Sequence, residues 1–354
     1  MMKKSFFVFF VTCMISHQAK LQTILSADGE GQTYELINSV LAPDGDVIET
    51  PDCSHEDFGR HITEQFDDEL DKFVFNFVLH VDEDDDRCIN FDRQRNEIKT
   101  YGNSPDHLLG VLEERVIYTW KFQLEEDFQP SSAFTHLHQL KAVGGSEDAM
   151  PLITLTARKG SPDNLELRYA ESLTQVTLVK FPLSEFRGRW VEVVEEVVYG
   201  DDLDGQYEVN ITAIDNGESL FSYSSDAIRM WKTNASFIRP KWGIYRSLND
   251  SQNLKDESVL YADFTIEEVN TNPLSVANEQ TVSIPTVIED ALHFDVQTLS
   301  RYSLAEIYTL GGRLVKQKKL DEYVDVSSLS KGLYILILRG DRQGEERVKF
   351  LKSK

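Results

Sequence analysis

The feature that most constrains the fold is a succession of short runs rich in β-branched and aromatic residues between about Thr33 and Val269, with little helical periodicity. Breakers such as "GSPDN" and "DNGES" separate the runs. So many antiparallel strands in one unit predict an all-β fold, a two-sheet antiparallel β-sandwich of jelly-roll type, followed by a small C-terminal β domain. The runs predict strands at residues 72–81, 115–124, 151–158, 165–170, 174–183, 189–200, 207–215 and 259–269.

The N-terminus has the pattern of a secretory signal peptide, which we expect over residues 1–22. Lys3 and Lys4 precede an apolar run from Phe6 to Ile15 that is too short to span a bilayer. The sandwich would then occupy residues 23–269, a polar linker residues 270–285 and the small domain residues 286–354. Outside the signal peptide only Cys53 and Cys88 remain, an even pair in a chain bound for an oxidising compartment. We expect them to form a disulfide; the alternative is two unpaired thiols.

The charge balance limits the partners of the chain. Sixty acidic residues against 36 basic ones give a net charge of −24. Such a chain lacks the basic footprint that nucleic acids and anionic membranes need, so we expect neither as a general partner. We also expect no membrane span, and a monomer. The oxygen-rich loops "PDGDVIETPD" and "DEDDD" are of the kind that calcium uses, so a structural calcium is an expectation without named ligands.

Two strands each gather cations on one face. In "RQRNEIK" the alternation of side chains places Arg93, Arg95, Glu97 and Lys99 together. In "RPKWGIY" Arg239, Lys241, Gly243 and Tyr245 share a face, while Trp242 and Ile244 take the other. A cationic sheet face inside an acidic chain predicts a groove for a polyanion.

The strand "FTHLHQLKAV" at residues 134–143 is ambiguous, because either His136 and His138 or Gln139 and Lys141 could lie on the polar face. Burying the Lys141 charge in the core would cost more than burying neutral imidazoles that have hydrogen-bond partners. This cost favours Gln139 and Lys141 on the groove face. A histidine could still reach the groove from the end of the strand, or from His80 or His61.

The C-terminal segment resembles a known export signal. Its elements "LAEIYTLGGRLVKQKKL", "VDVSSLSKGLYILIL" and "RVKFLKSK" resemble the C-terminal sorting domain of the type IX secretion system. The resemblance implies a protein that is secreted or held at the cell surface and that has the type IX machinery as a partner. The alternative is a small carbohydrate-binding β module.

The three cationic strands resemble, in the same chain order, the strand motifs of jelly-roll polysaccharide lyases of the alginate lyase type. The longer stretches "RQRNEIKTY", "HLHQLKAVGG" and "RPKWGIYRSLND" resemble the ulvan lyases of this fold, with glucuronan lyases as near neighbours. The middle motif departs from the pattern, because Lys141 occupies the place of the histidine of the family unless "HLH" is the counterpart. The resemblance implies β-elimination on an acidic, sulfated, uronate-containing polysaccharide, with no cofactor required.

The resemblance also implies roles for individual residues. Arg95 and Gln139 would neutralise the uronate carboxylate with help from Lys141, since elimination builds negative charge there. Tyr245 would transfer protons, its pKa lowered by Lys241 and Arg239, and His138 or His80 would act if a second group is needed. Further substrate-binding residues would be Arg93, Lys99, Arg239, Lys241, Arg246 and His80, and Glu97 would orient the cations.

Three rival functions stay open at this point. A glucuronan or alginate lyase would need the same chemistry with fewer sulfate-binding cations. A non-catalytic carbohydrate-binding sandwich could share the groove. A glycoside hydrolase of this fold commonly has a strand of paired carboxylates, E-x-D-x-x-E, and no such strand occurs in the sequence.

Overall fold

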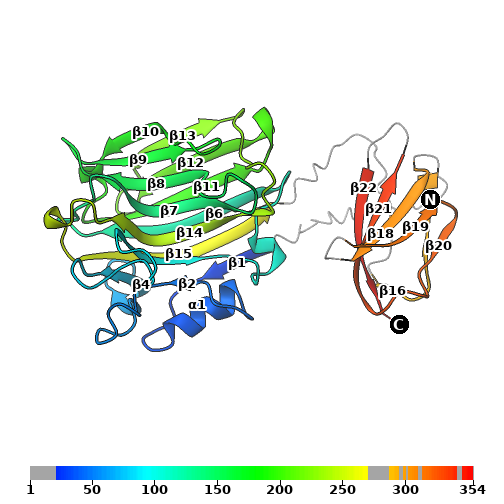
Figure 1. The fold of residues 1–354 in the computed structure, drawn as a ribbon, viewed down its shortest axis with the longest axis horizontal. Coiled ribbons are helices and arrows are strands. Elements are labelled where there is room, and N and C mark those ends of the chain that lie inside the picture. The colour runs from blue at the N-terminus through cyan, green and yellow to red at the C-terminus, as the bar shows by residue number, and fades with distance from the viewer. Residues whose placement is uncertain are drawn as a thin grey trace, which may run out of the picture. The chain divides into compact units, whose positions relative to one another are not determined.

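Two antiparallel sheets stack face to face in the part of the chain before residue 270 (Figure 1). The computed structural model describes residues 21–269, 287–294, 298–299, 302–309, 313–340 and 345–353, which divide between two units, 1–271 and 272–354. The stacked sheets confirm the predicted all-β sandwich. The expected signal peptide lies outside the described residues except for Leu21 and Gln22, which begin the first strand. The expected linker, 270–285, lies outside them entirely.

Among the described residues, one sheet has eight strands and the other has seven. In spatial order the eight-stranded sheet contains β13 (Ser219–Ser225), β12 (Gln206–Ala213), β11 (Trp190–Val198), β6 (Arg115–Leu124), β15 (Glu257–Val269), β4 (Lys72–Leu79) and β3 (Ile62–Asp67), and β1 (Leu21–Leu25) pairs with β15. The seven-stranded sheet contains β10 (Val176–Pro182), β9 (Asn164–Tyr169), β8 (Ile153–Arg158), β7 (Thr135–Val143), β14 (Phe237–Ser247), β5 (Arg93–Lys99) and β2 (Ile48–Glu49).

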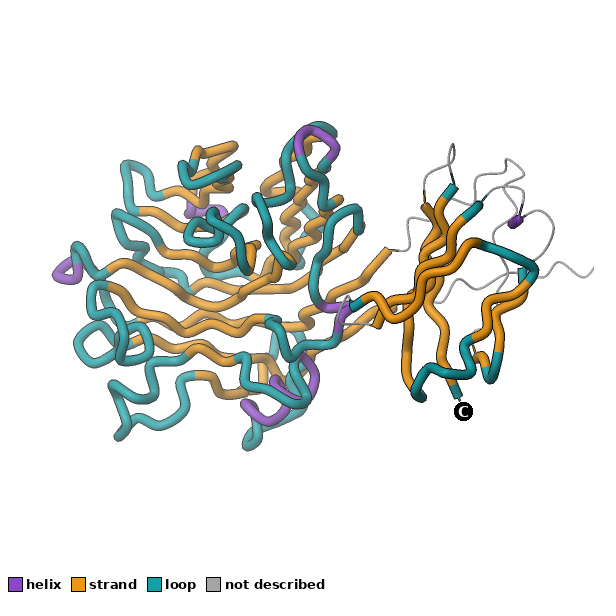
Figure 2. The backbone as a smooth tube through the Cα atoms, turned by 45° about the vertical axis from the view of Figure 1, so that its right-hand side comes forward, coloured by secondary structure: helices purple, strands orange, loops and turns teal. Residues whose placement is uncertain are grey.

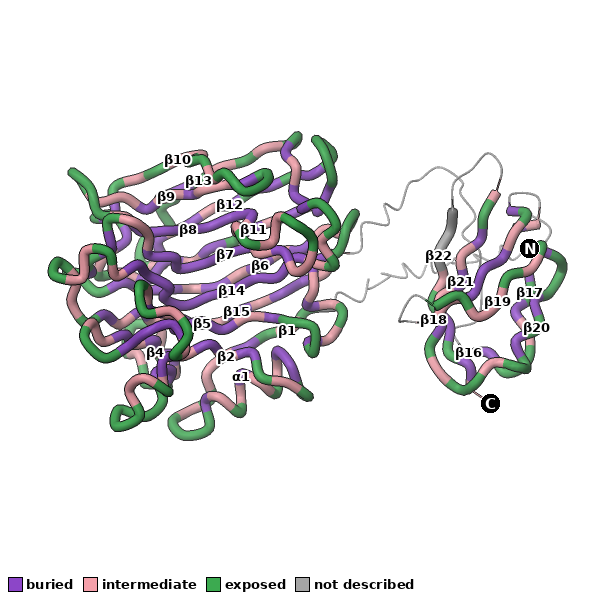
Figure 3. The backbone as a smooth tube through the Cα atoms, viewed as in Figure 1, coloured by how far each residue is buried: buried purple, intermediate pink, exposed green. Residues whose placement is uncertain are grey.

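The core lies between the sheets because each strand turns one face inward. β6 alternates without exception between half-buried and buried residues, and its buried members Tyr118, Trp120 and Phe122 are at most 1% exposed. The central strands β7 and β14 of the seven-stranded sheet are buried along most of their length, as Figure 3 shows. For β14 this burial extends to the face that points away from the core, and that face carries the predicted site.

The helix α1 (Thr33–Leu41) was not predicted from the sequence. Its buried residues Thr33, Ile37 and Leu41 recur every four positions, which is the spacing of one face of a helix. α1 contacts β1, β2 and β3, so it covers the edge of the sandwich where β2 and β3 are the outermost strands (Figure 1). Loops and short 3-10 turns join the strands at both ends (Figure 2): η1 (Asp106–Leu108), η2 (Leu183–Glu185), η3 (Asp202–Asp204) and η4 (Ser251–Asn253).

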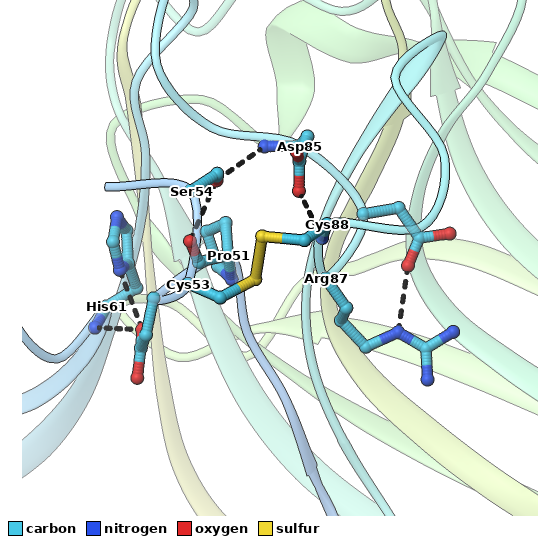
Figure 4. Close-up of a disulfide and its surroundings, with 9 residues drawn as sticks. Pro51, Cys53, Ser54, His61, Asp85, Arg87 and Cys88 are labelled. Carbon is cyan, nitrogen blue, oxygen red and sulfur yellow. Dashed lines mark hydrogen bonds and ion pairs between the residues drawn. A yellow bond between two sulfur atoms is a disulfide. The ribbon is translucent and has the colours of Figure 1, made fainter. Parts of the chain in front are cut away.

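The predicted disulfide between Cys53 and Cys88 is present, with a Cα–Cα distance of 6.3 Å. It joins the loop after β2 to the loop before β5. The Ser54 hydroxyl accepts a hydrogen bond from the backbone N–H of Asp85, and the Asp85 carboxylate accepts one from that of Cys88 (Figure 4). The base of the loop that leads into β5 is therefore held by a covalent bond.

The second unit has its own sheets and its own core. In spatial order its larger sheet contains β16 (Val287–Ile288), β22 (Glu345–Lys352), β21 (Gly332–Arg339), β18 (Leu304–Thr309) and β19 (Leu314–Lys319), and β17 (Ala291–His293) pairs with β20 (Tyr323–Asp325). Ile307, Leu336 and Phe350 belong to its core. The small C-terminal β domain is thus confirmed. None of the helices in the described residues is long and apolar enough to cross a membrane.

Candidate functional site

The three strands singled out in the sequence are neighbours in the seven-stranded sheet, in the order β7, β14, β5. The register places Lys241 of β14 opposite Lys99 on one side and Gln139 on the other. Tyr245 lies opposite Arg95 and His136 in the same way. Residues that are far apart in the chain therefore form one continuous cationic surface, the groove face, on the side of the sheet that points away from the core.

A pair of β-bulges settles which residues of β7 belong to the groove face. The pairing of β7 shifts between His136 and His138, and that of β14 shifts between Trp242 and Tyr245. His136 and Gln139 therefore both line the groove face, while Leu137 and His138 are buried on the core side. The two alternatives drawn from the sequence were not exclusive, because strict alternation fails at a bulge.

Gly243 at this bulge has a structural requirement for glycine. Its φ is +139°, and a Cβ atom there would lie 2.1 Å from the carbonyl oxygen of Asn96. The hydroxyl of Tyr261 lies 2.9 Å from the carbonyl oxygens of both Gly243 and Leu137. The bulge is thus held from the core side, and it fixes the positions of Tyr245 and His136.

Glu97 is the centre of the groove face and is only 1% exposed. Its carboxylate accepts hydrogen bonds from Arg95, from Gln139 and, at 2.5 Å, from Lys241. Burial would raise the pKa of Glu97, but Lys241 and Arg95 reverse the direction and hold it below its ordinary value. Glu97 therefore stays ionised and fixes the positions of its neighbours, as the sequence predicted.

Two further carboxylates of the site were missed in the sequence because they come from outside the three strands. Glu49 of β2 accepts from Lys241 at 2.5 Å and from Lys99 at 2.8 Å. Asp86, in the loop tied by the disulfide, accepts from Nε of Arg95 at 2.8 Å. Pairing of β2 with β5 brings Glu49 to the site, and no local pattern in the sequence signals that pairing.

The charges on the groove face leave an excess of positive charge. Four carboxylates, those of Glu49, Glu97, Asp86 and Asp92, face six cations, which gives a net charge of +2 in a chain whose total is −24. The six cations are Arg93, Arg95, Lys99, Lys141, Arg239 and Lys241. The predicted cationic surface therefore persists after its internal ion pairs are counted, and it suits an anionic ligand.

A cavity of about 330 Å³ opens on the groove face beside these charges. Arg93, Arg95, Gln139, Lys141 and Tyr245 line it, all of which were named from the sequence. The lining also includes residues that were not assigned there, from β7 and its entry, from β8 and β9, and from nearby loops: Ala133, Phe134, His136, Ala149, Met150, Pro151, Thr156, Arg158, Arg168 and Gln175. The alternation in "LTAR" puts Thr156 and Arg158 on one face of their strand, and that in "LELRY" puts Glu166 and Arg168 together on theirs. The register brings both pairs to the same face of the sheet, so this pattern could have indicated some of the lining residues.

Tyr245 is held by two arginines. Its hydroxyl accepts a hydrogen bond of 3.0 Å from Arg93, and the guanidinium carbon of Arg95 lies 3.7 Å from its ring centroid. Burial raises the pKa of Tyr245 more than Arg95 and Arg93 lower it, so the net direction is upward. The expectation that Lys241 and Arg239 lower this pKa is therefore wrong, and the phenol is protonated at neutral pH.

Lys141 and His136 have lowered pKa values, in contrast to Tyr245. Burial lowers the pKa of Lys141 to about 8, and the positive charges of Lys241, Arg239 and Arg95 act in the same direction. Burial also lowers the pKa of His136 to about 3, so its imidazole is neutral. The buried Nδ1 of His136 has no hydrogen-bond partner in the described part of the chain. The cavity thus holds an amine that can lose its proton near neutral pH and a neutral imidazole free to meet a ligand.

Three residues predicted for the site lie elsewhere. The catalytic role predicted for His138 is wrong, because its ring is buried between the sheets, where Nε2 lies 2.9 Å from Glu195 and the ring packs on Trp120. Arg246 is fully buried on the opposite side of β14 and donates to Gln94 at 2.7 Å, so it is no substrate subsite. The alternation of side chains along β14 already places Arg246 and Tyr245 on opposite faces of the sheet.

His80 is the third of these residues. It follows β4 and does not line the cavity; its ring packs against those of His55 and Phe58. The predictions of a catalytic or substrate-binding role for His80 are therefore not supported by its position.

Lys99, Arg239 and Lys241 lie on the groove face but do not line the cavity. Lys241 is 2% exposed and is held between Glu49 and Glu97. Arg239 is 7% exposed and lies over the ring of Tyr101, and its buried Nε and one terminal nitrogen have no hydrogen-bond partner in the described residues. Lys241 therefore holds the carboxylates of Glu49 and Glu97 in place beneath the surface. Arg239 has N–H donors that are still available on the groove face.

The C-terminal unit can be identified by comparison with known proteins. Residues 285–352 match the secretion system C-terminal sorting domain. This domain directs the chain to the exterior or the surface of the cell through the type IX secretion machinery, as the sequence predicted. No curated protein matches the sequence.

Solved structures resemble the sandwich. The endo-β-1,4-glucuronan lyase of the fungus Trichoderma reesei is 16% identical with a TM-score of 0.43, and the match covers 59% of this chain and 87% of that chain. The PL-14 alginate lyase of Aplysia kurodai is 14% identical with a TM-score of 0.47, and the match covers 69% of this chain and 97% of that chain. At these values the likeness concerns the fold alone.

Proposed function

We propose that the chain is a secreted polysaccharide lyase that cleaves an acidic, uronate-containing polysaccharide of the sulfated ulvan type by β-elimination. The observation that carries the proposal is that Lys141 and Tyr245 line the same cavity. Lys141 has a pKa of about 8, and the pKa of Tyr245 is raised. One group can accept a proton at mildly alkaline pH while the other still has one to donate. β-Elimination needs a base for the C5 proton and an acid for the leaving C4 oxygen, and these two groups can supply both.

The reaction would proceed as follows on these residues. The neutral amine of Lys141 takes the proton from C5 of the uronate, and the electrons of the C5–H bond form the C4=C5 double bond. The C4–O bond breaks, and the phenol of Tyr245 gives its proton to the leaving oxygen. Solvent then restores both groups to their starting protonation states. Lys141 therefore takes the role of base, which the sequence had given to Tyr245.

The carboxylate next to C5 must be neutralised, because negative charge builds up on it as the proton leaves. Gln139, Arg95 and the neutral His136 line the cavity around the place it would occupy. Arg95 is already bonded to Glu97 and Asp86, so it acts as a fixed cation, which avoids reorganisation during the reaction. Glu97, Glu49 and Lys241 are positioning residues in this scheme.

The preference for a sulfated polymer rests on the additional arginines of the cavity. Arg93, Arg158 and Arg168 line it beyond the reacting groups. Guanidinium groups offer paired donors to oxyanions such as sulfate. A non-sulfated uronate polymer would have less use for them.

The experiment uses the purified full chain with ulvan, glucuronan and alginate in separate incubations. The ultraviolet absorbance of unsaturated uronate ends and the number of new reducing ends are followed together. We expect both to grow on ulvan. Reducing ends without absorbance would identify a hydrolase, and binding without either signal a binding module. An absorbance increase only with glucuronan or alginate would support the β-elimination mechanism but refute the proposed preference for a sulfated substrate.

A further inference from the structure

Three histidines and an aspartate from two loops converge beside the disulfide, away from the cavity. His55, His61, His80 and Asp84 each offer one ligand atom, and these atoms all lie within 4.8 Å of one another. Oδ1 of Asp84 lies 3.0 Å from Nε2 of His61 and 3.1 Å from Nδ1 of His55, and Oδ2 lies 3.2 Å from Nδ1 of His80. Neither the proposed lyase chemistry nor the core packing uses this cluster of three imidazoles around a single carboxylate.

The surroundings of His61 favour a positive charge in the cluster. The ring is fully buried, and both of its nitrogens face carboxylates: Nδ1 lies 2.8 Å from Asp52, and Nε2 faces Asp84. A neutral imidazole has one N–H donor only. When it donates Nδ1–H to Asp52, its Nε2 lone pair points at an oxygen of Asp84, a repulsive contact that either a second proton on the ring or a metal cation between the two atoms relieves. The carboxylate–histidine pair on the far side of the ring is the usual support of a metal-bound histidine.

We propose that His55, His61, His80 and Asp84 form a zinc site. Three imidazoles and one carboxylate are ligands that zinc prefers, whereas calcium takes oxygen ligands almost alone. Tetrahedral ligands at zinc bond lengths lie about 3.3 Å apart, and the His61–Asp84 and His55–Asp84 separations are already close to this value. The side chains of His55 and His80 are 21% and 18% exposed, so their rings have room to rotate toward the ion.

The site is closed, which indicates a structural role. Four protein ligands fill a tetrahedral shell and leave no position for substrate. The ring of Phe58 packs against the imidazoles, with centroids 4.7 Å from His61 and 4.3 Å from His80. Cys53 and Cys88 lie nearby but are joined to each other, so they are unavailable as ligands. His61 is seen beside the disulfide in Figure 4.

The ion would join two loops that the disulfide also ties together, residues 50–61 between β2 and β3 and residues 80–92 between β4 and β5. The second loop also carries Asp86, which holds Arg95 on the groove face, and the side chain of Gln94 donates to the backbone oxygens of His80 and Asp84. The zinc site and the disulfide would together stabilise the loop that leads into β5, the strand that carries Arg95 and Glu97 of the groove face.

The test measures the metal content of the purified full chain by mass spectrometry after dialysis against micromolar zinc chloride and then metal-free buffer. We expect about one zinc per chain. A His55→Ala/His80→Ala double variant should bind zinc at least 100-fold more weakly. The matched control is His107→Ala/His293→Ala, which removes two histidines outside the cluster and should keep one zinc.

A second measurement does not depend on the folding of any variant. Cobalt chloride titrated into the metal-free wild-type chain should give the visible absorption of tetrahedral Co²⁺, and zinc but not calcium should abolish it. Absence of both bound zinc and this spectrum would overturn the proposal. Zinc retained by the His55→Ala/His80→Ala variant, or displacement of zinc by calcium, would overturn it as well.

Discussion

The outward faces of the two sheets use the same arrangement of charges in different surroundings. On the eight-stranded sheet, Asp263 accepts from Lys72 at 2.5 Å and from Lys121 at 2.7 Å, with side chains that are 19%, 36% and 24% exposed. On the groove face, Glu97 is shared by Lys241 and Arg95, and these side chains are 1%, 3% and 11% exposed. Water screens the first cluster, so its pairs contribute little.

Burial is what converts the second cluster into a candidate site. Charges out of contact with water must be fully paired, and any that are not shift their pKa values or seek a ligand. The groove face shows both outcomes: Lys141 has a pKa lowered to about 8, and Arg239 keeps buried donors without a partner in the described residues. On the outward face of the other sheet both lysines that contact Asp263 are paired with it, and this pairing lowers the pKa of the carboxylate to about 2.

The largest expected difference between the faces concerns catalysis. Tyr245→Phe removes the proposed acid while keeping the ring under Arg95, and kcat on the preferred polysaccharide should fall by about 10² to 10⁴-fold. Tyr223→Phe, on β13 of the other sheet, is the matched control and should keep its activity. Initial rates of absorbance increase measure both variants. A Tyr245→Phe enzyme within about threefold of wild type would refute the assigned role.

A smaller difference is expected in stability. Glu97→Gln leaves Lys241 and Arg95 buried with a weakened partner and should lower the free energy of unfolding by about 3–5 kcal/mol. Asp263→Asn breaks a solvent-screened cluster and should cost less than about 1 kcal/mol. Urea unfolding followed by tryptophan fluorescence isolates the sandwich, because all four tryptophans lie before residue 270. Equal losses of unfolding free energy in the two variants would show that burial does not make the charge cluster of the groove face more important for stability than that of the other sheet.

The pH dependence of the rate should reveal Lys141. Its pKa of about 8 lies below the ordinary value for lysine, and the base must be neutral, so activity should rise about tenfold per pH unit below pH 8 and level off above it. Tyr245 keeps its proton throughout this range because its pKa is raised. Lys141→Arg, which stays charged, should abolish the rise together with most of the activity. A wild-type rate that falls from pH 6 to pH 8 would exclude Lys141 as the base.

Local patterns in the sequence predicted the strands and much of the site. The predicted strand at residues 115–124 matches β6 in both bounds, and alternation placed Arg95, Lys241 and Tyr245 on one face. These successes share a cause: a strand buried on one side must alternate, and its sequence records the alternation directly.

The failures come from pairing between distant segments. The bulge that separates His136 from His138 exists because two partner strands of β7 impose shifted registers, which the strand alone does not encode. Glu49 and Asp86 reach the site through β2 and a disulfide-tied loop. Burial, too, is a tertiary property, and it reversed the expected direction of the pKa of Tyr245.

The central claim, that the groove face holds a uronate for elimination, is tested most directly by a crystal structure of the Tyr245→Phe variant with a sulfated uronate oligosaccharide. The account predicts a sugar carboxylate beside Gln139, Arg95 and His136, with C5 facing the Lys141 amine and the leaving oxygen facing residue 245. An oligosaccharide bound on the eight-stranded sheet, or one in the groove with C5 directed away from Lys141, would contradict it.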